Sequence, residues 1–573
     1  AIRVEKCRGR LDCLMEMVSS RPIEGTAGIA HTRWATHGAP SDQNSHPHTS
    51  NDGKISLVHN GIIENYTQIK EDLIKKGYIF SSETDTEVIV HLIRDCYRGD
   101  ILEATFCAVK ELKGAYSLVI LCEDEPDRLI AVRKDSPLII GAGKGENFVA
   151  SDIPAILDYT KDVFLMENGE IASVTPDRIE IFDEAKNPVK KQLFKVTWDA
   201  KDATKAGYEH FMIKEIHEQP EAILNTLRGR LNDSTLAVKL DCFELTKEDF
   251  DRIKDIYIVA CGTAYHAGLV GKALIERDTR RKVTAEIASE FRENDPIIGE
   301  GTLFIAISQS GETADTLESM RLAKRKGARV LAITNVVGSS VARESHDVLY
   351  TWAGPEIAVA STKAYSTQLI ALLLLAIKFA ALSGRCGREQ LEGLYSSCVM
   401  SSKLAESALL QEKEIAQIAK VFVGASDAFY IGRGLDYFLA MEGSLKMKEI
   451  SYIHAEAYQA GELKHGPIAL LDQGIPVVAL CTQKGEQLSK CLCNIKETKA
   501  RGAYVVAIAQ RDCGEVAKEA DDVIWIEPCP NEAALIPAAV ILQTLAYYAA
   551  KYRGCDIDKP KNLAKSVTVE IGR

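Results

Sequence analysis

The sequence predicts an α+β domain followed by two doubly wound α/β domains with parallel sheets. The chain has 573 residues, which at about 100–200 residues per domain corresponds to three or four domains. Its first third mixes short β-like runs with helical patterns. Its second half contains an internal repeat, in which apolar strands alternate with amphipathic helices. These observations predict a multidomain protein of the α/β and α+β classes.

The first 195 residues are expected to form the α+β layered domain. Turns rich in Gly, Asn and Asp separate its elements. The expected elements are β-like runs at 54–59, 116–122 and 128–132 and helices at 66–76 and 85–97. A polar stretch with Pro188 ends the domain, so we place a linker at 196–210.

The internal repeat predicts two similar domains in the second half. Three blocks recur in the same order at an offset of 172 to 175 residues: 257–262 with 430–434, 308–312 with 482–486, and 327–333 with 502–508. We place the first domain at 211–395, the second at 396–555 and a C-terminal tail at 556–573. Ligands of such sheets bind beyond the carboxyl ends of the strands, so the loops that follow strands are the informative ones.

Charge excludes some classes of function. The formal net charge of −12 argues against binding of nucleic acid or of an anionic membrane. An anionic substrate is compatible with this charge, because hydroxyls and backbone amides hold a phosphate locally.

Cysteine usage and hydropathy indicate a cytoplasmic protein. The 15 cysteines follow no disulfide or zinc spacing, so we expect reduced thiols. The longest apolar run, Leu369–Ile377, is too short for a membrane span and is expected to be a buried helix. A metal site at His46, His48 and His59 is disfavoured, because no carboxylate frames the cluster. We expect no metal and no cofactor.

Two hydroxyl-rich loops of the first repeat are candidates for binding a phosphate. The loop Ser308–Thr313 follows an apolar strand and precedes a helical pattern, so hydroxyls and free amides meet at a helix N-terminus. The loop Val359–Lys363 also opens a helix. For both loops the alternative is an ordinary capped helix start.

Candidate acid–base groups lie in the second repeat and in the tail. Glu442, Lys446 and Glu449 are spaced i, i+4, i+7 and share one helix face, although a solvated salt-bridge ladder has the same spacing. His465 lies in a Gly-rich, charged segment and could serve acid–base chemistry near neutral pH. A lysine of the apolar tail could form a Schiff base with a sugar carbonyl, or it could be an ordinary surface lysine.

Three motifs of the first domain could bind an amino acid. Arg33 could fork onto a carboxylate, and Asn60 beside Gly61 could donate to an oxyanion. Asp85 could bind an ammonium group or could only cap the helix that it starts.

In combination, these motifs resemble one family, the isomerising glutamine–fructose-6-phosphate aminotransferases. The resemblance runs from about Gly9 to Glu570 and rests on the blocks His31–Gly38, His59–Gly61, Ser82–Glu87, Ser308–Thr313, Glu462–Pro467 and Lys565–Glu570. It implies an N-terminal-nucleophile glutaminase domain of αββα architecture followed by two sugar-isomerase (SIS) domains. The implied activity transfers the amide nitrogen of glutamine to fructose-6-phosphate and gives glucosamine-6-phosphate and glutamate.

The resemblance also implies roles for single residues. In the glutaminase domain, Arg33 would bind the glutamine carboxylate, Asp85 its amino group, and Asn60 with Gly61 would form the oxyanion hole. The implied glutamine site also contains Trp34, which would gate ammonia, Thr36 and His37. The implied sugar-phosphate site comprises Thr263, Ser308, Gln309, Ser310, Thr313, Val359 and Ser361. The implied catalytic groups are Lys565 for the Schiff base, Glu449 for proton transfer, Lys446 for proton balance, and His465 for ring opening.

The family resemblance further implies a homodimer in which His465 comes from the neighbouring subunit. Two departures from the family pattern lead to expectations of their own. Residue 1 is Ala where the family has a nucleophilic Cys, and neither Cys7 nor Cys13 fits that role, so we expect an N-terminally truncated chain without the nucleophile that retains only the sugar-isomerase half. Ala264 stands where some relatives have Ser, so either one phosphate hydroxyl is absent or Thr263 suffices.

Two other functions are weighed against this one. A sugar-phosphate-binding regulator would use the same α/β domains without chemistry, but it would not need Glu449, His465 and Lys565. An isomerase without a nitrogen donor would not need the attached glutaminase domain.

Overall fold

The computed structural model describes residues 1–573 except 10, 34–37, 197–203, 233–234, 241–242 and 568–573. The expected site residues Trp34, Thr36 and His37 therefore lie outside the described residues. The chain forms two compact units, residues 1–200 with 567–573 and residues 201–566.

The first unit contains two antiparallel sheets. The larger has the strand order β1-β2-β3-β4-β8-β9, and the smaller the order β10-β7-β5-β6. Their strands are β1 His48–Thr49, β2 Ile55–Gly61, β3 Tyr116–Cys122, β4 Leu129–Lys134, β5 Ile139–Ala142, β6 Asn147–Ala150, β7 Asp162–Leu165, β8 Ile171–Val174, β9 Ile179–Phe182 and β10 Phe194–Lys195. The helices are α1 Leu11–Ser20, α2 Tyr66–Lys75, α3 Glu87–Cys96 and α4 Ile101–Val109.

The core of this unit follows from its hydrophobic pattern. β2 buries Ile55 and Leu57, and α3 packs an apolar face that includes Ile89 and Ile93 against them. The helix α4 begins where the Asp100 side chain accepts hydrogen bonds from the backbone amides of the first turn. The strands and helices named from the sequence are all present, and the structure adds seven further strands, β1 and β5 to β10.

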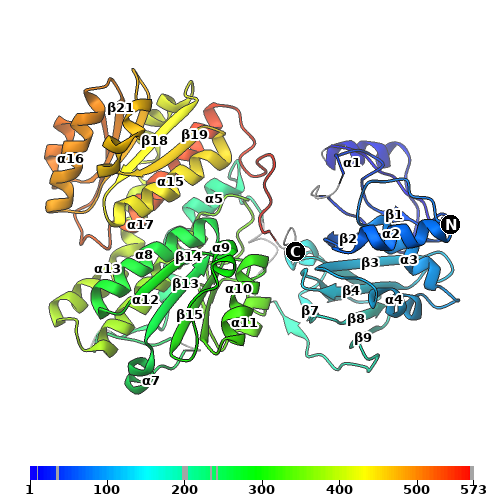
Figure 1. Ribbon diagram of the computed structural model, residues 1–573. Coiled ribbons are helices and arrows are strands. Elements are labelled where there is room, and N and C mark those ends of the chain that lie inside the picture. The colour runs from blue at the N-terminus through cyan, green and yellow to red at the C-terminus, as the bar shows by residue number, and fades with distance from the viewer. Residues whose placement is uncertain (10, 34–37, 197–203, 233–234, 241–242, 568–573) are drawn as a thin grey trace. The chain divides into compact units, whose positions relative to one another are not determined.

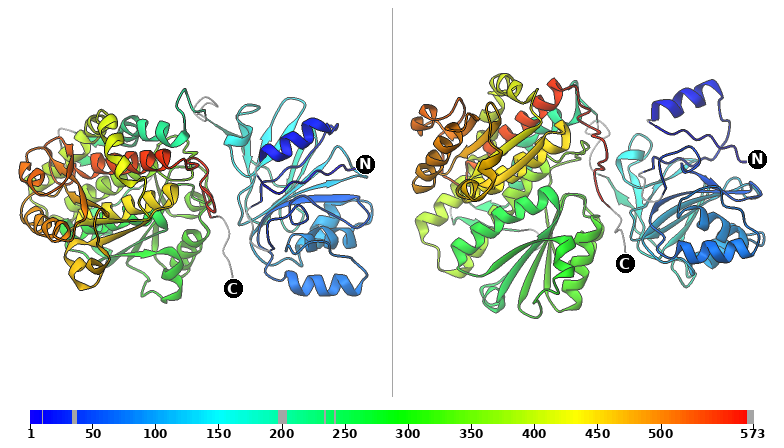
Figure 2. Two further views of the ribbon diagram at one scale, coloured as in Figure 1. Left: turned by 90° about the horizontal axis from the view of Figure 1, so that it is seen from above. Right: turned by 45° about the horizontal axis from the view of Figure 1, so that its top comes forward.

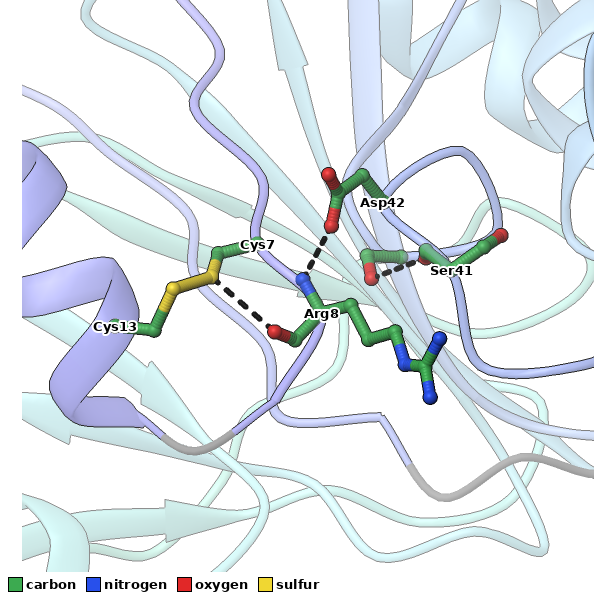
Figure 3. Close-up of a disulfide and its surroundings, with 6 residues drawn as sticks. Cys7, Arg8, Cys13, Ser41 and Asp42 are labelled. Atoms are coloured by element: carbon green, nitrogen blue, oxygen red, sulfur yellow. Dashed lines mark hydrogen bonds between the residues drawn. A yellow bond between two sulfur atoms is a disulfide. The ribbon is translucent and has the colours of Figure 1, made fainter.

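A disulfide corrects the expectation that all cysteines are reduced. Cys7 and Cys13 are bonded to each other at the start of α1 (Figure 3). The backbone amide of Arg8, which follows Cys7, donates a hydrogen bond to Asp42. The other twelve described cysteines are free.

The second unit contains two parallel sheets of five strands with the same topology. Their strand orders are β14-β13-β15-β16-β17 and β19-β18-β20-β21-β22, so the expected repeat of parallel α/β domains is present (Figure 1). The strands are β13 Asp255–Ala260, β14 Val283–Ile287, β15 Thr302–Ser308, β16 Arg329–Thr334, β17 Asp347–Tyr350, β18 Asp427–Gly432, β19 His454–Gln459, β20 Pro476–Cys481, β21 Tyr504–Gln510 and β22 Asp522–Ile526. A short antiparallel pair, β11 Leu231–Asn232 and β12 Ala237–Val238, precedes them.

The helices of the second unit cover both faces of each sheet. They are α5 Phe211–His217, α6 Gln219–Leu227, α7 Lys247–Arg252, α8 Gly262–Thr279, α9 Ala288–Glu293, α10 Ala314–Arg325, α11 Ser340–Glu344, α12 Lys363–Ser383, α13 Arg388–Leu409, α14 Glu412–Ile418, α15 Leu435–Ser451, α16 Glu486–Lys499 and α17 Leu535–Tyr552. Alternate residues of β13 show the arrangement, because Ile256 and Ile258 pack in the cluster of α8 and α12, while Tyr257 and Val259 pack with α9 and α10. The expected domain boundary between residues 395 and 396 lies within α13.

The apolar run Leu369–Ile377 lies in a buried helix, α12, as expected, although the helix extends beyond the run at both ends. Among the described residues it is the one helix long and apolar enough to cross a membrane, and 78% of its most apolar window is buried inside the protein. It packs against α8 and α6 in the core that joins the two parallel sheets. Figure 2 shows the helices and sheets of this unit from two further directions. Its hydropathy is therefore explained by burial in the protein.

Candidate functional site

The loop Ser308–Thr313 connects β15 to α10 at the carboxyl end of the sheet. The hydroxyls of Ser308 and Thr313 lie 2.9 Å apart, and Ser308 Oγ accepts a hydrogen bond from the Gly311 amide at 3.0 Å. Thr313 occupies the N-cap of α10, but its side chain makes no capping hydrogen bond. The hydroxyls thus hold the loop together and do not serve as the helix cap that was the alternative.

Gly311 is required by the packing of this loop. Its φ angle is +67°, which favours glycine, and a Cβ atom there would overlap the Ser339 side chain. The close approach of Ser339 therefore fixes the loop against the start of α11.

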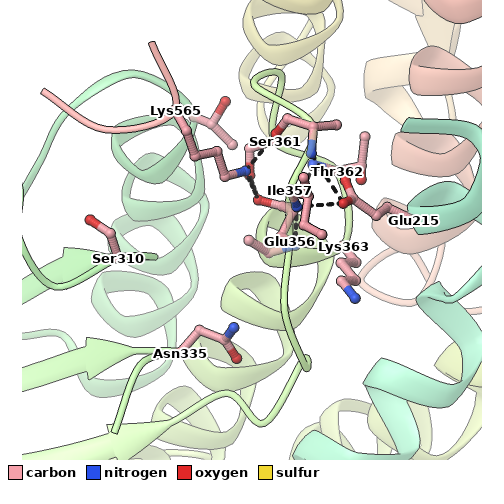
Figure 4. Close-up of polar contacts among 12 residues, drawn as sticks. Glu215, Ser310, Asn335, Glu356, Ile357, Ser361, Thr362, Lys363 and Lys565 are labelled. Carbon is pink, nitrogen blue, oxygen red and sulfur yellow. Dashed lines mark hydrogen bonds and ion pairs between the residues drawn. The ribbon is translucent and has the colours of Figure 1, made fainter. Parts of the chain in front are cut away.

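A buried carboxylate, that of Glu356, organises the second hydroxyl loop (Figure 4). It accepts hydrogen bonds from the Ser361 hydroxyl at 3.0 Å, the Thr362 amide at 2.8 Å and the Ala364 amide at 3.0 Å. These donors lie at the N-terminus of α12, where the helix dipole favours a negative charge. Sequence reasoning singled out Ser361 but missed Glu356, although a Glu five residues before a hydroxyl-rich helix start was a usable signal.

The tail brings Lys565 to this carboxylate. Lys565 Nζ lies 2.5 Å from a Glu356 carboxylate oxygen and 2.8 Å from the Ala358 carbonyl oxygen. Burial would raise the pKa of the Glu356 carboxyl, but the charge and hydrogen bond of Lys565 outweigh it and hold that pKa below its ordinary value. The next residue, Ser566, places its hydroxyl 3.0 Å from that of Ser310. The tail therefore joins both hydroxyl loops.

The expected acid–base face of α15 is buried against α8. Lys446 Nζ lies 2.6 Å from Glu449 and 3.4 Å from Glu442, and it donates to the Thr263 hydroxyl at 3.0 Å. Thr263 and His266 of α8 in turn contact the Glu442 carboxylate at 3.0 and 2.7 Å. Because Lys446 and Glu442 are buried, the face is not the solvated ladder that was the alternative.

The environment of Lys446 keeps its side chain charged. Burial alone would lower the pKa of this lysine, but the carboxylates of Glu449 and Glu442 outweigh burial and raise it above the ordinary value. A lysine that holds its proton this firmly is a poor nucleophile.

His465 is not brought to these groups within the chain. It ends the 3₁₀ helix Ala460–His465, and its side chain is exposed. Among the described residues, no contact links it to Glu449 or to Lys565. Val359, by contrast, donates its amide to the Asp558 carbonyl of the tail at 3.3 Å.

In the second repeat, the loop that corresponds to Ser308–Thr313 is occupied by a side chain of the protein itself. The buried Asp436 carboxylate accepts hydrogen bonds from the Thr482 amide at 2.9 Å and hydroxyl at 2.5 Å, and from the Gln483 amide at 3.3 Å. Burial outweighs these bonds and raises the pKa of Asp436 to about 6. In this loop a carboxylate of the chain itself accepts the bonds that an anion would accept, which leaves the loop of the first repeat as the candidate anion site.

In the first unit, the expected glutamine-site residues lie around the end of β2. His31 Nε2 and Asn60 Oδ1 are 2.7 Å apart, and Asp85 accepts a hydrogen bond from the Ile63 amide at 2.8 Å. Burial lowers the pKa of Arg33, and the Asp85 charge partly offsets the effect, so these two side chains share one electrostatic environment. Gly61 has a φ of +128°, and a Cβ there would overlap the Ala115 carbonyl.

The histidines of the first unit pack against one another. The rings of His31 and His46 stack with centroids 4.2 Å apart, and the ring of His48 meets that of His46 edge-on at 5.0 Å. Burial, reinforced by neighbouring positive groups, lowers the pKa of His46, and burial lowers that of His48 to about 3. Within the described part of the chain, no group of three or more potential ligands could hold a metal ion.

Comparisons with known proteins agree with these domains. A glutamine amidotransferase domain model matches residues 31–158, and an SIS domain model matches residues 250–378 and 422–551. A curated relative, the glutamine–fructose-6-phosphate aminotransferase (isomerizing) of Caldanaerobacter subterraneus subsp. tengcongensis, is 55% identical over 99% of this chain and 93% of its own length. The chain belongs to the isomerising glutamine–fructose-6-phosphate aminotransferases.

Further relatives place both halves of the chain in this aminotransferase family. The enzyme of the same name from Clostridium tetani is 52% identical over 99% of this chain and 93% of its own length. The solved C-terminal domain of glucosamine-fructose-6-phosphate aminotransferase from Francisella tularensis is 42% identical, with a TM-score of 0.59, and covers 62% of this chain and 100% of that chain. Membership in the aminotransferase family makes this chain a transferase.

The comparisons correct two expectations about the amidotransferase half. The expectation that only the sugar-isomerase half is retained is not supported, because the amidotransferase domain is present at residues 31–158. The accompanying description of this domain as truncated is not supported either, since the alignment with the first relative spans 99% of this chain and 93% of that protein.

Proposed function

We propose that the chain transfers the amide nitrogen of glutamine to fructose-6-phosphate with ketose-to-aldose isomerisation, giving glucosamine-6-phosphate and glutamate. This reaction is a first step toward amino sugars, and we place it in the cytoplasm. The observation that carries the proposal is the position of Lys565, a primary amine on the tail between two hydroxyl-rich loops, 2.5 Å from the buried Glu356 carboxylate.

The sugar phosphate would bind with its phosphate at the first hydroxyl loop. The hydroxyls of Ser308, Ser310 and Thr313 and the N-terminus of α10 supply donors there. Gln309, Thr263, Val359 and Ser361 would complete the sugar site. The proximity of Ser566 to Ser310 supports this placement, because it sets Lys565 one residue away from the proposed phosphate loop.

The chemistry then follows from the buried Lys446, the partly exposed Lys565 and the carboxylates that pair with them. Lys565, once deprotonated, would attack the C2 carbonyl of the open-chain ketose, and loss of water would give an iminium. Ammonia would then add to C2, the bond from C2 to Lys565 Nζ would break, and the free lysine amine would be restored for the next cycle. Glu449 would move a proton from C1 to C2, while Lys446 would stabilise the charge that develops on the oxygen.

In the first unit, Arg33 would bind the carboxylate of glutamine and Asp85 its ammonium group. Asn60 and the Gly61 amide would donate to the oxyanion that forms when a nucleophile adds to the amide carbon, before the C–N bond breaks and ammonia leaves. The electrostatic coupling of Arg33 and Asp85 and the position of Asn60 beside His31 support these roles. We further propose a homodimer in which His465 serves the sugar site of the neighbouring subunit, which its exposure in its own chain supports.

The proposal is tested by tracing nitrogen. With glutamine labelled with ¹⁵N in the amide, we expect mass spectrometry to find the label in glucosamine-6-phosphate formed from fructose-6-phosphate. Unlabelled glutamine with labelled ammonium is the matched control. Failure of both nitrogen sources to enter a sugar phosphate would reject the proposed function.

Binding of the sugar phosphate should depend on the first hydroxyl loop. Replacing Ser308, Ser310 and Thr313 together by Ala removes three donors, and at about 1.5–3 kcal/mol for a hydrogen bond to a charged group even one lost contact weakens binding about tenfold or more. Calorimetric titration with glucosamine-6-phosphate measures this loss. Unchanged affinity in a variant with the parent melting temperature would show that the loop binds no phosphate.

A further inference from the structure

A buried carboxylate on α5 holds the backbone turn that faces Lys565. Glu215 is 1% exposed, and its Oε1 accepts hydrogen bonds from the backbone amides of Ile357 at 2.5 Å and Ala358 at 3.1 Å (Figure 4). This turn carries both acceptors of the Lys565 ammonium, the Glu356 carboxylate and the Ala358 carbonyl. Glu215 thus contacts Lys565 only indirectly, through the turn that both residues bind.

The helix α5 also holds the tail that carries Lys565. The Asp558 carboxylate accepts hydrogen bonds from the Phe211 and Met212 amides at 2.9 and 3.0 Å, at the N-terminus of this helix. The Asp558 carbonyl accepts from the Val359 amide at 3.3 Å. The short helix α5 therefore holds both the turn and the tail, and the contact between turn and tail positions the Lys565 amine.

The electrostatics of Glu215 connect it to the same site. Burial, increased by the charge of Glu356 and offset in part by Lys565, raises the pKa of Glu215 to about 7. Its second carboxyl oxygen, Oε2, is buried without a hydrogen-bond partner among the described residues. Burying a carboxyl group with only one oxygen hydrogen-bonded costs free energy of desolvation. A residue that only fills space in the core would not need such a group.

We propose that Glu215 is a positioning residue for the Schiff-base lysine: through the amides of Ile357 and Ala358 it fixes the turn that orients the Lys565 amine toward the sugar carbonyl. The inference rests on the proposed role of Lys565. Glu215 touches neither sugar nor amine, so its effect passes through the turn. A misplaced amine slows attack on the carbonyl but leaves the phosphate contacts intact.

The test follows the iminium itself and needs no glutamine. The protein is mixed with a range of fructose-6-phosphate concentrations and quenched with borohydride at successive times. Peptide mapping by mass spectrometry then gives the rate of reduced adduct formation at Lys565. Glu215→Ala should lower the maximal rate about 10- to 100-fold, the change that corresponds to losing one or two hydrogen bonds to a charged group, and change the half-saturating sugar concentration less than about threefold.

Conservative variants separate positioning from general stability. Glu215→Gln keeps an acceptor at the same reach and should stay within about threefold of the parent rate, whereas Glu215→Asp, one methylene shorter, should fall about tenfold. Asp436 is the matched control, because it is also a buried carboxylate that accepts two backbone amides, but in the second repeat. Asp436→Ala should lower the melting temperature without lowering the adduct rate of the folded protein.

Each outcome decides between the proposals. A parent protein that forms no adduct at Lys565 overturns the proposed function and this inference with it. A parent adduct together with a parent-like rate in Glu215→Ala overturns the inference alone. If the alanine variant does not fold, equal rates for Glu215→Gln and Glu215→Asp overturn it, and so does an equal loss of rate in folded Asp436→Ala.

Discussion

Lys565→Arg is expected to abolish formation of glucosamine-6-phosphate while sugar binding persists. A guanidinium retains the charge that pairs with Glu356, but it does not lose its proton and so cannot form the imine. The rate of product formation should fall by about a thousandfold or more, since the covalent route is lost. The borohydride adduct with fructose-6-phosphate should disappear from the mass spectrum.

The control for this variant lies in the same tail. Lys561 is exposed, with its ammonium 4.4 Å from the ring of Tyr452, and Lys561→Arg retains that contact with the aromatic face. We expect this variant to keep the parent rate and the parent adduct. Parent-like turnover in a folded Lys565→Arg protein would contradict the Schiff-base assignment.

Glu449→Gln is expected to stop proton transfer but not adduct formation. An amide of the same shape does not accept the C1 proton, and loss of a general base costs about 10²- to 10⁴-fold in rate. The iminium at Lys565 forms before this step, so the borohydride adduct should persist. Exchange of the C1 hydrogen of fructose-6-phosphate with deuterated water, followed by NMR, measures the lost step directly.

A second carboxylate nearby provides the comparison. Glu456 of β19 pairs with Lys448 at 3.2 Å and is partly exposed, outside the Lys446 network. Glu456→Gln should retain the parent exchange rate. Exchange at the parent rate in Glu449→Gln would show that another group carries the proton.

Replacing Glu449 is also expected to affect stability, because Glu449 pairs with the buried Lys446. Its fully buried ammonium lies between Glu442 and Glu449, so the Gln variant removes one of two compensating charges. The melting temperature of Glu449→Gln therefore has to be compared with that of the parent. Adduct formation in the variant serves as the check that the sugar site is still assembled.

The sequence alone determined the repeat of two parallel α/β domains and pointed to most of the candidate groups. The repeat of blocks such as 308–312 and 482–486 predicted two parallel sheets of one topology, because strand and helix periods are local properties of the chain. The loop Ser308–Thr313 was identified for the same reason, since a strand followed by hydroxyls and a helix is readable from neighbouring residues. The family resemblance rested on such contiguous blocks.

Only the tertiary structure decided which groups act together. Glu356 and Lys565 are 209 residues apart, and Glu215 reaches the turn of Glu356 from another helix, so no local pattern pairs them. The two repeats look alike in sequence, yet only in the second does an aspartate, Asp436, occupy the loop after the strand. That contact forms because the start of α15 packs against the end of β20, 46 residues later in the chain. Such contacts form only when elements that are far apart in the chain pack together, and the spacing of residues along the sequence does not give the distances between packed elements.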